Sequence, residues 1–120
     1  MKLAFTTSGS TLESSLDPRF GRAPKFLLYD TETKTAVAID NTPALNAAQG
    51  AGVQAAEAVV KAGADGLVTG HVGPKAFRVL TAAGITIFLT DAPTIAEALG
   101  RWSEGKLSPA PSPDVEGHWA

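Results

Sequence analysis

The feature that most constrains the fold of this chain is a short apolar run that ends in a glycine-rich turn. Gly66-Leu67-Val68 leads into Thr69-Gly70-His71-Val72-Gly73-Pro74, and helical spacing follows. Gly70 and Gly73 permit a positive φ or a close approach of the backbone to a ligand, and Pro74 suits the first turn of a helix. A strand, a glycine turn and a helix N-terminus together present N–H groups to an anion. The sequence therefore predicts an α/β fold that holds something negative at the end of a sheet.

The rest of the chain predicts a mixed sheet. Strands are expected at Lys2–Thr6, Lys25–Asp30, Thr35–Asp40, Ala64–Thr69 and Ile85–Leu89, and helices at Ala51–Ala62, Pro74–Ala83 and Pro93–Trp102. Thr90 or Asp91 is the expected N-cap of the last helix. Short spacing makes the second and third strands an antiparallel hairpin, whereas strand–helix–strand units indicate parallel strands. The predicted order is β-β-β-α-β-α-β-α, in a single domain over residues 1–107. The proline-rich residues 108–120 are expected to form an extended C-terminal tail.

Composition narrows the classes of function. With 120 residues, 44% hydrophobic and 18% charged, the chain is expected to be one globular domain. A net charge of −2 gives no case for nucleic-acid binding. The chain has no cysteine, which excludes disulfides, cysteine nucleophiles and thiolate-held iron–sulfur clusters. No apolar run approaches the roughly 20 residues of a membrane span, and no signal peptide is evident, so a cytoplasmic location without membrane contact is expected.

Three glycine-bearing loops are expected to meet in one cleft. They are residues 8–23, Gly50-Ala51-Gly52 and Gly70–Gly73. Ligands of open α/β sheets collect at the carboxyl ends of parallel strands, and the convergence requires the first and fourth strands to be neighbours. The Gly-x-Gly segment lacks the rest of a dinucleotide or Walker fingerprint. Nucleotide binding is therefore disfavoured, and this segment is alternatively a plain helix start.

The first loop carries two permanent positive charges in Arg19-Phe20-Gly21-Arg22. Arginine suits oxyanions and soft polyanions because its planar fork is always charged. The alternative is that Arg19 and Arg22 are surface charges paired with Asp17 or Glu13. His71 lies inside a glycine turn and can donate to an anion or ligate a metal. No acid–base pair or catalytic triad is suggested by position.

Taken in order, these motifs resemble the dinitrogenase iron–molybdenum cofactor biosynthesis family, which includes NifX-like proteins and the C-terminal domain of NifB-like proteins. The residues that carry the resemblance are Asp17-Pro18-Arg19-Phe20-Gly21-Arg22-Ala23-Pro24, Asn41-Thr42-Pro43, Gly50-Ala51-Gly52 and Thr69-Gly70-His71-Val72-Gly73-Pro74. The resemblance covers nearly the whole chain. It implies a ribonuclease H-like fold with a five-stranded mixed sheet flanked by helices and without nuclease activity.

The resemblance also implies a function. A compact member without cysteine is expected to be a non-catalytic binding or carrier protein for a molybdenum–copper sulfide cluster, in which copper bridges two thiomolybdates, held without covalent attachment. Other proteins of the same pathway are possible partners. The alternatives are a carrier or chaperone for iron–molybdenum cofactor precursors and, from another class, an enzyme acting on a small phosphorylated substrate.

The implied binding residues combine charge, backbone N–H groups and apolar walls. They are Arg19, Phe20, Gly21, Arg22, Gly50, Ala51, Gly52, Gly70, His71, Val72, Gly73, Pro74 and Phe77. The arginines are expected to supply charge and the glycine segments N–H donors, with Phe20, Val72 and Phe77 as walls. No direct protein ligand to the metal is expected, and His71 is the only candidate for one.

Overall fold

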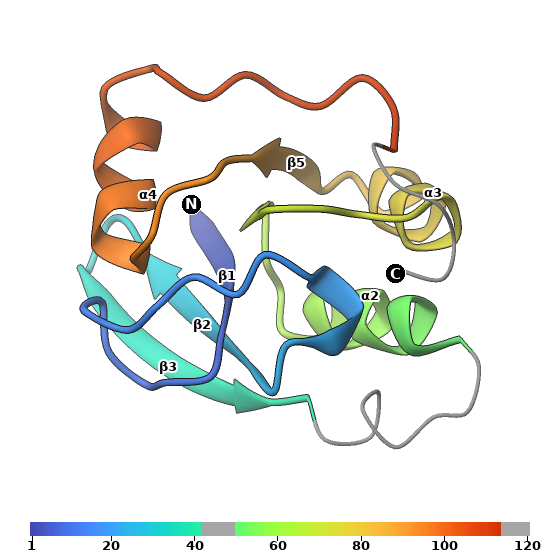
Figure 1. Ribbon diagram of the computed structural model, residues 1–120, viewed down its shortest axis with the longest axis horizontal. Helices are drawn as coiled ribbons and strands as arrows, with labels where there is room; N and C mark the ends of the chain where they lie inside the picture. Colours follow the sequence, from blue (N-terminus) through green and yellow to red (C-terminus); the bar gives the residue numbers. More distant parts are fainter. Residues whose placement is uncertain (42–49, 114–120) are drawn as a thin grey trace.

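A five-stranded mixed sheet lies between helices on its two faces, as expected (Figure 1). The computed structural model describes residues 1–41 and 50–113. Its strands are β1 (Lys2–Thr7), β2 (Lys25–Asp30), β3 (Thr35–Asp40), β4 (Gly66–Thr69) and β5 (Thr86–Leu89). Its helices are the short 3-10 helix η1 (Phe20–Arg22) and the α-helices α2 (Ala51–Lys61), α3 (Pro74–Ala82) and α4 (Ile95–Ser103).

The strand order is β3-β2-β1-β4-β5. β2 pairs antiparallel with both β1 and β3, which confirms the predicted hairpin. β4 lies between β1 and β5 and is parallel to both. β1 and β4 are therefore neighbours, and the carboxyl ends of β1, β4 and β5 share one edge of the sheet. This is the arrangement that the predicted convergence of loops requires.

Alternation along β1 divides the core into two layers. Ala4 faces the helices α2 and α3, in a buried cluster with Ala56 of α2 and Leu80 of α3. Leu3 and Phe5 face the opposite side, in a second cluster that includes Ile95 and Ala98 of α4. Successive side chains of a strand point to opposite faces, so the apolar stretch Leu3-Ala4-Phe5 supplies both clusters.

Helix α4 begins later than the sequence pattern suggested. Its N-cap is Thr94, whose Oγ1 accepts a hydrogen bond from Glu97 N at 3.2 Å. The expected caps were Thr90 or Asp91, with the helix starting at Pro93. Thr94-x-x-Glu97 is a capping-box pattern, and this local signal fixes the start at Ile95. Residues 90–93 are consequently left as a loop at the carboxyl edge of the sheet.

The segment after α4 runs beside the outer edge of β5. Ala110 N donates to Ile87 O at 2.8 Å, and Pro109 bridges to Phe88. The domain boundary expected at residue 107 stays a prediction. Residues 42–49 and 114–120, which include Thr42, Pro43 and most of the expected tail, lie outside the described residues. Within residues 1–41 and 50–113, no helix is long and apolar enough to cross a membrane.

Candidate functional site

The long segment after β1 is held firmly to the end of that strand. Asp17 N donates to Thr6 O at 2.7 Å, and Thr6 Oγ1 donates to Asp17 O at 2.6 Å. Thr7 Oγ1 donates to Ser15 O at 2.7 Å. The buried hydroxyl of Thr6 also lies 2.8 Å from that of Thr69 at the end of β4. Buried hydroxyls thus position residues 15–17 over the carboxyl ends of β1 and β4.

The same segment connects two other loops at this edge. Leu16 N donates to Pro93 O at 3.1 Å, which joins it to the loop between β5 and α4. Phe20 N donates to His71 O at 3.3 Å, and Arg19 forms an isolated parallel bridge with His71. The structure therefore brings together the first and third of the three predicted loops. The loop between β5 and α4, which was not predicted to belong to the site, completes the arrangement.

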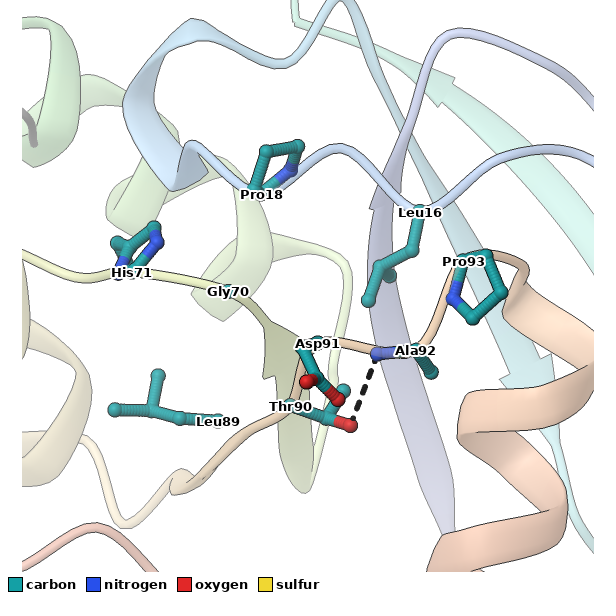
Figure 2. A pocket seen from close by; sticks show the side chains of 9 residues that line it. All are labelled: Leu16, Pro18, Gly70, His71, Leu89, Thr90, Asp91, Ala92 and Pro93. Carbon is teal, nitrogen blue, oxygen red and sulfur yellow. Dashed lines mark hydrogen bonds between the residues drawn. The ribbon is translucent and has the colours of Figure 1, made fainter.

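A cavity of about 470 Å³ opens between these loops (Figure 2). It is lined by Leu16, Pro18, Gly70, His71, Leu89, Thr90, Asp91, Ala92 and Pro93. Most of these residues are apolar, and the volume lies in the range of small-molecule sites. We refer to this cavity as the loop pocket. Its position at the carboxyl ends of parallel strands is where ligands of open α/β sheets bind.

Gly70 allows two walls of the loop pocket to touch. A Cβ built at this glycine would lie 2.7 Å from both Cα and O of Pro18. Neither Gly70 nor Gly73 has a positive φ, and the N-cap Gly73 has φ −79°. The positive-φ role suggested by the sequence is therefore wrong for this turn. Close approach is the role that the structure gives to Gly70.

Residues of the loop between β5 and α4 were missed by the sequence reasoning. Thr90–Pro93 supply four of the nine residues that line the loop pocket, and Leu89 at the end of β5 supplies a fifth. The segment has no glycine, and Thr90 and Asp91 were interpreted as caps. Ligands collect at the carboxyl ends of parallel strands, and β5 is one of these strands. This rule could have identified the loop after β5 as part of the site.

The two arginines of the first loop, Arg19 and Arg22, do not line the loop pocket. Arg19 Nε is 4.0 Å from Asp17 Oδ1, and Arg19 N donates to the same oxygen at 2.9 Å. The Arg19 side chain is 52% exposed. Arg22 has no ion pair within the part of the chain that the structure describes. The alternative of a surface pair with Asp17 thus applies to Arg19.

Asp91 brings a carboxylate to the loop pocket together with its own counter-ion. Arg101 Nη1 donates to Asp91 Oδ1 at 2.8 Å and to Thr90 Oγ1 at 3.1 Å. The hydrogen bond from Arg101 lowers the pKa of the Asp91 carboxyl below its ordinary value of 3.8. At neutral pH this wall therefore carries a paired negative charge.

Several predicted binding residues contribute to the core. The side chains of Phe20 and Val72 are completely buried, and the Phe20 ring centroid is 5.7 Å from that of Phe26. Phe77 is half-buried and packs against the same cluster. The apolar walls of the loop pocket are instead supplied by residues such as Leu16 and Leu89.

The second glycine segment begins α2, as its alternative interpretation held. Gly50 is the N-cap with φ 77°, while Ala51 and Gly52 are buried. α2 packs against η1, but these three residues do not line the loop pocket. Gly21, Gly73 and Pro74 do not line it either. In this arrangement, Gly70 and His71 alone of the predicted residues line the cavity.

The donor set favours an anion over a bare metal ion. Across residues 1–41 and 50–113, no group of three histidine, aspartate or glutamate side chains is arranged to hold a metal. His71 lies half-buried on the wall of the loop pocket, on the opposite side of Gly70 from Asp91 (Figure 2). Mainly apolar walls with a single imidazole suit a large ligand with polarisable outer atoms, and Arg19 and Arg101 lie near these walls, each in a pair with an aspartate.

Comparisons with known proteins agree with one another. A family model described as dinitrogenase iron-molybdenum cofactor matches residues 1–105. The apo form of the orange protein from Desulfovibrio gigas is similar to this chain, with a TM-score of 0.92, 39% identity, and coverage of 95% of this chain and 96% of that one. A Thermotoga protein provisionally assigned as NifB has a TM-score of 0.83 and 33% identity, covering 97% and 98%. An uncharacterized protein of Methanocaldococcus jannaschii is 33% identical over 95 residues, 77% of this chain and 80% of its own length.

Proposed function

Because the chain belongs to the dinitrogenase iron–molybdenum cofactor family, as its motifs predicted, we propose that it binds and carries an anionic molybdenum–copper–sulfur cluster without catalysing a reaction. The family and the similarity to the orange protein support a role in binding or carrying a metal–sulfur cofactor. The finer assignment is that copper bridges two thiomolybdates and that the cluster is held without covalent attachment. The cluster is the cargo of the protein.

The loop pocket is the observation that carries this proposal. A cavity of about 470 Å³ has mainly apolar walls, the permanent charge of Arg19 on a neighbouring loop, and a carboxylate, that of Asp91, whose charge Arg101 compensates. Soft sulfide surfaces suit apolar walls, and the net negative charge of a thiomolybdate cluster suits arginine. A chain without cysteine has no thiolate to replace the cluster's own sulfurs. The residues present therefore fit non-covalent retention.

Most of the predicted binding residues have a specific place in the proposal. Arg19 and Arg22 supply charge, and the backbone around Gly70 and His71 forms the cluster-facing wall. Phe20 and Val72 act indirectly, because their buried side chains fix the backbone beside that wall. The segment Gly50–Gly52 orients α2 against η1. If the protein supplies a direct metal ligand, His71 is the candidate among the predicted binding residues.

A second candidate is a carrier for iron–molybdenum cofactor precursors. It is favoured by the description of the family, which names that cofactor, and by the Thermotoga relative assigned as NifB. The two candidates share the loop pocket and differ in the metal. An enzyme that acts on a small phosphorylated substrate is less favoured, because the sequence suggests no acid–base pair or catalytic triad by position.

Three broader assignments accompany the proposal. The ribonuclease H-like designation is supported by the strand order, with β2 as the antiparallel strand. A cytoplasmic location and partners from the same pathway follow from the proposed cargo. A role in nucleic-acid binding is not proposed, since the chain is acidic overall.

Reconstitution tests the proposal. Adding thiomolybdate and copper to the metal-free chain is expected to give a strong visible absorption that stays with the protein through gel filtration. Retention is expected to fall severalfold as salt rises from about 0.05 M to about 0.5 M, because exposed charge interactions are screened. Thiomolybdate without copper, and copper alone, serve as controls. If neither colour nor metal stays with the folded protein, the proposal is wrong, and salt-independent retention would show that charge does not hold the cluster.

A further inference from the structure

Arg101 connects helix α4 to the loop that forms one wall of the loop pocket. Its Nη1 donates to Asp91 Oδ1 at 2.8 Å and to Thr90 Oγ1 at 3.1 Å. Its Nη2 lies 4.0 Å from Glu97 Oε2, one turn earlier on the same helix. One guanidinium therefore holds two consecutive residues that line the pocket.

The contact extends further along the wall through Thr90. The Thr90 hydroxyl also accepts a hydrogen bond from Ala92 N at 3.2 Å (Figure 2). Thr90 N in turn donates to Thr69 O at 2.9 Å, which ties the start of the loop to β4. Arg101, Thr90 and Ala92 thus form a short chain of hydrogen bonds that spans the pocket wall. Without the Arg101 guanidinium, the Thr90 hydroxyl would lose its hydrogen bond to helix α4.

The negative charge of Asp91 means that its contact with Arg101 affects whether the loop pocket can hold an anion. The Asp91 side chain is 97% exposed and belongs to the lining of the loop pocket. An unpaired carboxylate at this place would repel an anionic ligand. Paired with Arg101, the Asp91 carboxylate contributes little negative potential in the loop pocket. An ion pair as exposed as this one contributes little to folding. Its effect is therefore expected at the pocket and not in the overall stability.

We propose that Arg101 is a positioning residue that fixes the Thr90–Pro93 wall and compensates the charge of Asp91, so that the loop pocket accepts an anion. This inference rests on the proposed function for its anionic ligand. It assigns a role to a residue that lies on α4, outside the glycine loops. Arg101 is the counter-ion of Asp91, and its presence explains how an anion site tolerates a carboxylate on its wall.

The test uses three variants and thiomolybdate with copper as the probe. Arg101→Gln is expected to weaken cluster retention about fivefold to tenfold, because a pocket-side charge becomes uncompensated. Asp91→Asn with Arg101→Gln is expected to recover retention to within about twofold of the parent, because no uncompensated charge is left. Lys106→Gln removes one positive charge from a pair with Glu104 in the segment after α4 and is expected to change nothing. Circular dichroism checks that each variant is folded.

Amide hydrogen exchange provides a readout that needs no cluster. In Arg101→Gln, the Ala92 N–H is expected to exchange faster, because its acceptor Thr90 has lost its anchor. If the parent retains no cluster, the proposed function fails, while faster exchange at Ala92 still supports the positioning role. Unchanged exchange at Ala92 in Arg101→Gln would overturn that role. Charge compensation would be overturned if Arg101→Gln retained the cluster as well as the parent does. It would also be overturned if the double variant retained the cluster as weakly as Arg101→Gln does.

Discussion

Replacing Gly70 by valine is expected to abolish cluster retention in the reconstitution assay. The new Cβ would lie 2.7 Å from Cα and O of Pro18, so the backbone of the first loop must move away. Overpacking of this kind costs about 1–3 kcal/mol in the free energy of unfolding. The expected result is loss of the visible absorption on gel filtration, together with a lower unfolding midpoint by circular dichroism. Gly70→Ala is expected to show the same two effects to a smaller extent.

Gly100 is the matched control for this prediction. It lies in α4, and a Cβ built there meets no atom within 4 Å. Gly100→Ala is expected to raise stability by about 0.5–1 kcal/mol, because alanine is the better helix former, and to leave cluster retention unchanged. If Gly70→Val retains the cluster as the parent does, the contact between Gly70 and Pro18 does not shape the site.

The second large effect is expected from the two arginines of the first loop. Arg19→Gln with Arg22→Gln should weaken retention about tenfold to a hundredfold, which corresponds to about 1.4–2.8 kcal/mol for the two charges together. Stability should change by less than about 0.5 kcal/mol, because both side chains belong to a surface loop. Visible titration measures the first quantity, and thermal unfolding measures the second.

The control for the arginines removes the same amount of charge elsewhere. Lys61 ends α2, and Lys106 follows α4. Both helices start at the carboxyl edge of the sheet, so both lysines lie toward the opposite edge. Lys61→Gln with Lys106→Gln is expected to leave retention within about twofold, because these charges lie beyond about one Debye length from the site. Equal losses in the two double variants would mean that net charge, and not the first loop, governs binding.

Most of the fold was predictable because its signals are local. Lys25–Asp30 and Thr35–Asp40 are separated by a short turn, and this spacing alone predicts the hairpin that the structure contains. Helix, glycine and strand follow each other twice from Ala51 on, with Gly63 before β4 and Gly84 before β5, and these alternating helices and strands predict parallel strands. The start of α4 was misplaced because two candidate caps precede the pair Thr94 and Glu97, and only the latter matches a capping box.

The candidate site was less predictable because its residues meet through long-range contacts. The bridge between Arg19 and His71 confirms that two of the predicted loops lie side by side. Nothing in the local sequence shows that Phe20 and Val72 are fully buried, since an aromatic or valine beside glycine suits both a wall and a core. The loop after β5 was overlooked because no glycine marks it. Arg101 is ten residues from Asp91, and the structure was required to join them.

Metal analysis of the protein isolated from its native source is the most direct test of the central claim. The account predicts molybdenum and copper in the folded, coloured protein, with about twice as much molybdenum as copper and with sulfide that acid releases. Chain integrity by mass spectrometry would show an unmodified polypeptide, as non-covalent retention requires. Iron together with molybdenum in place of copper would contradict the copper-bridged cluster and support a carrier for iron–molybdenum cofactor precursors. A colourless protein without molybdenum would contradict the account as a whole.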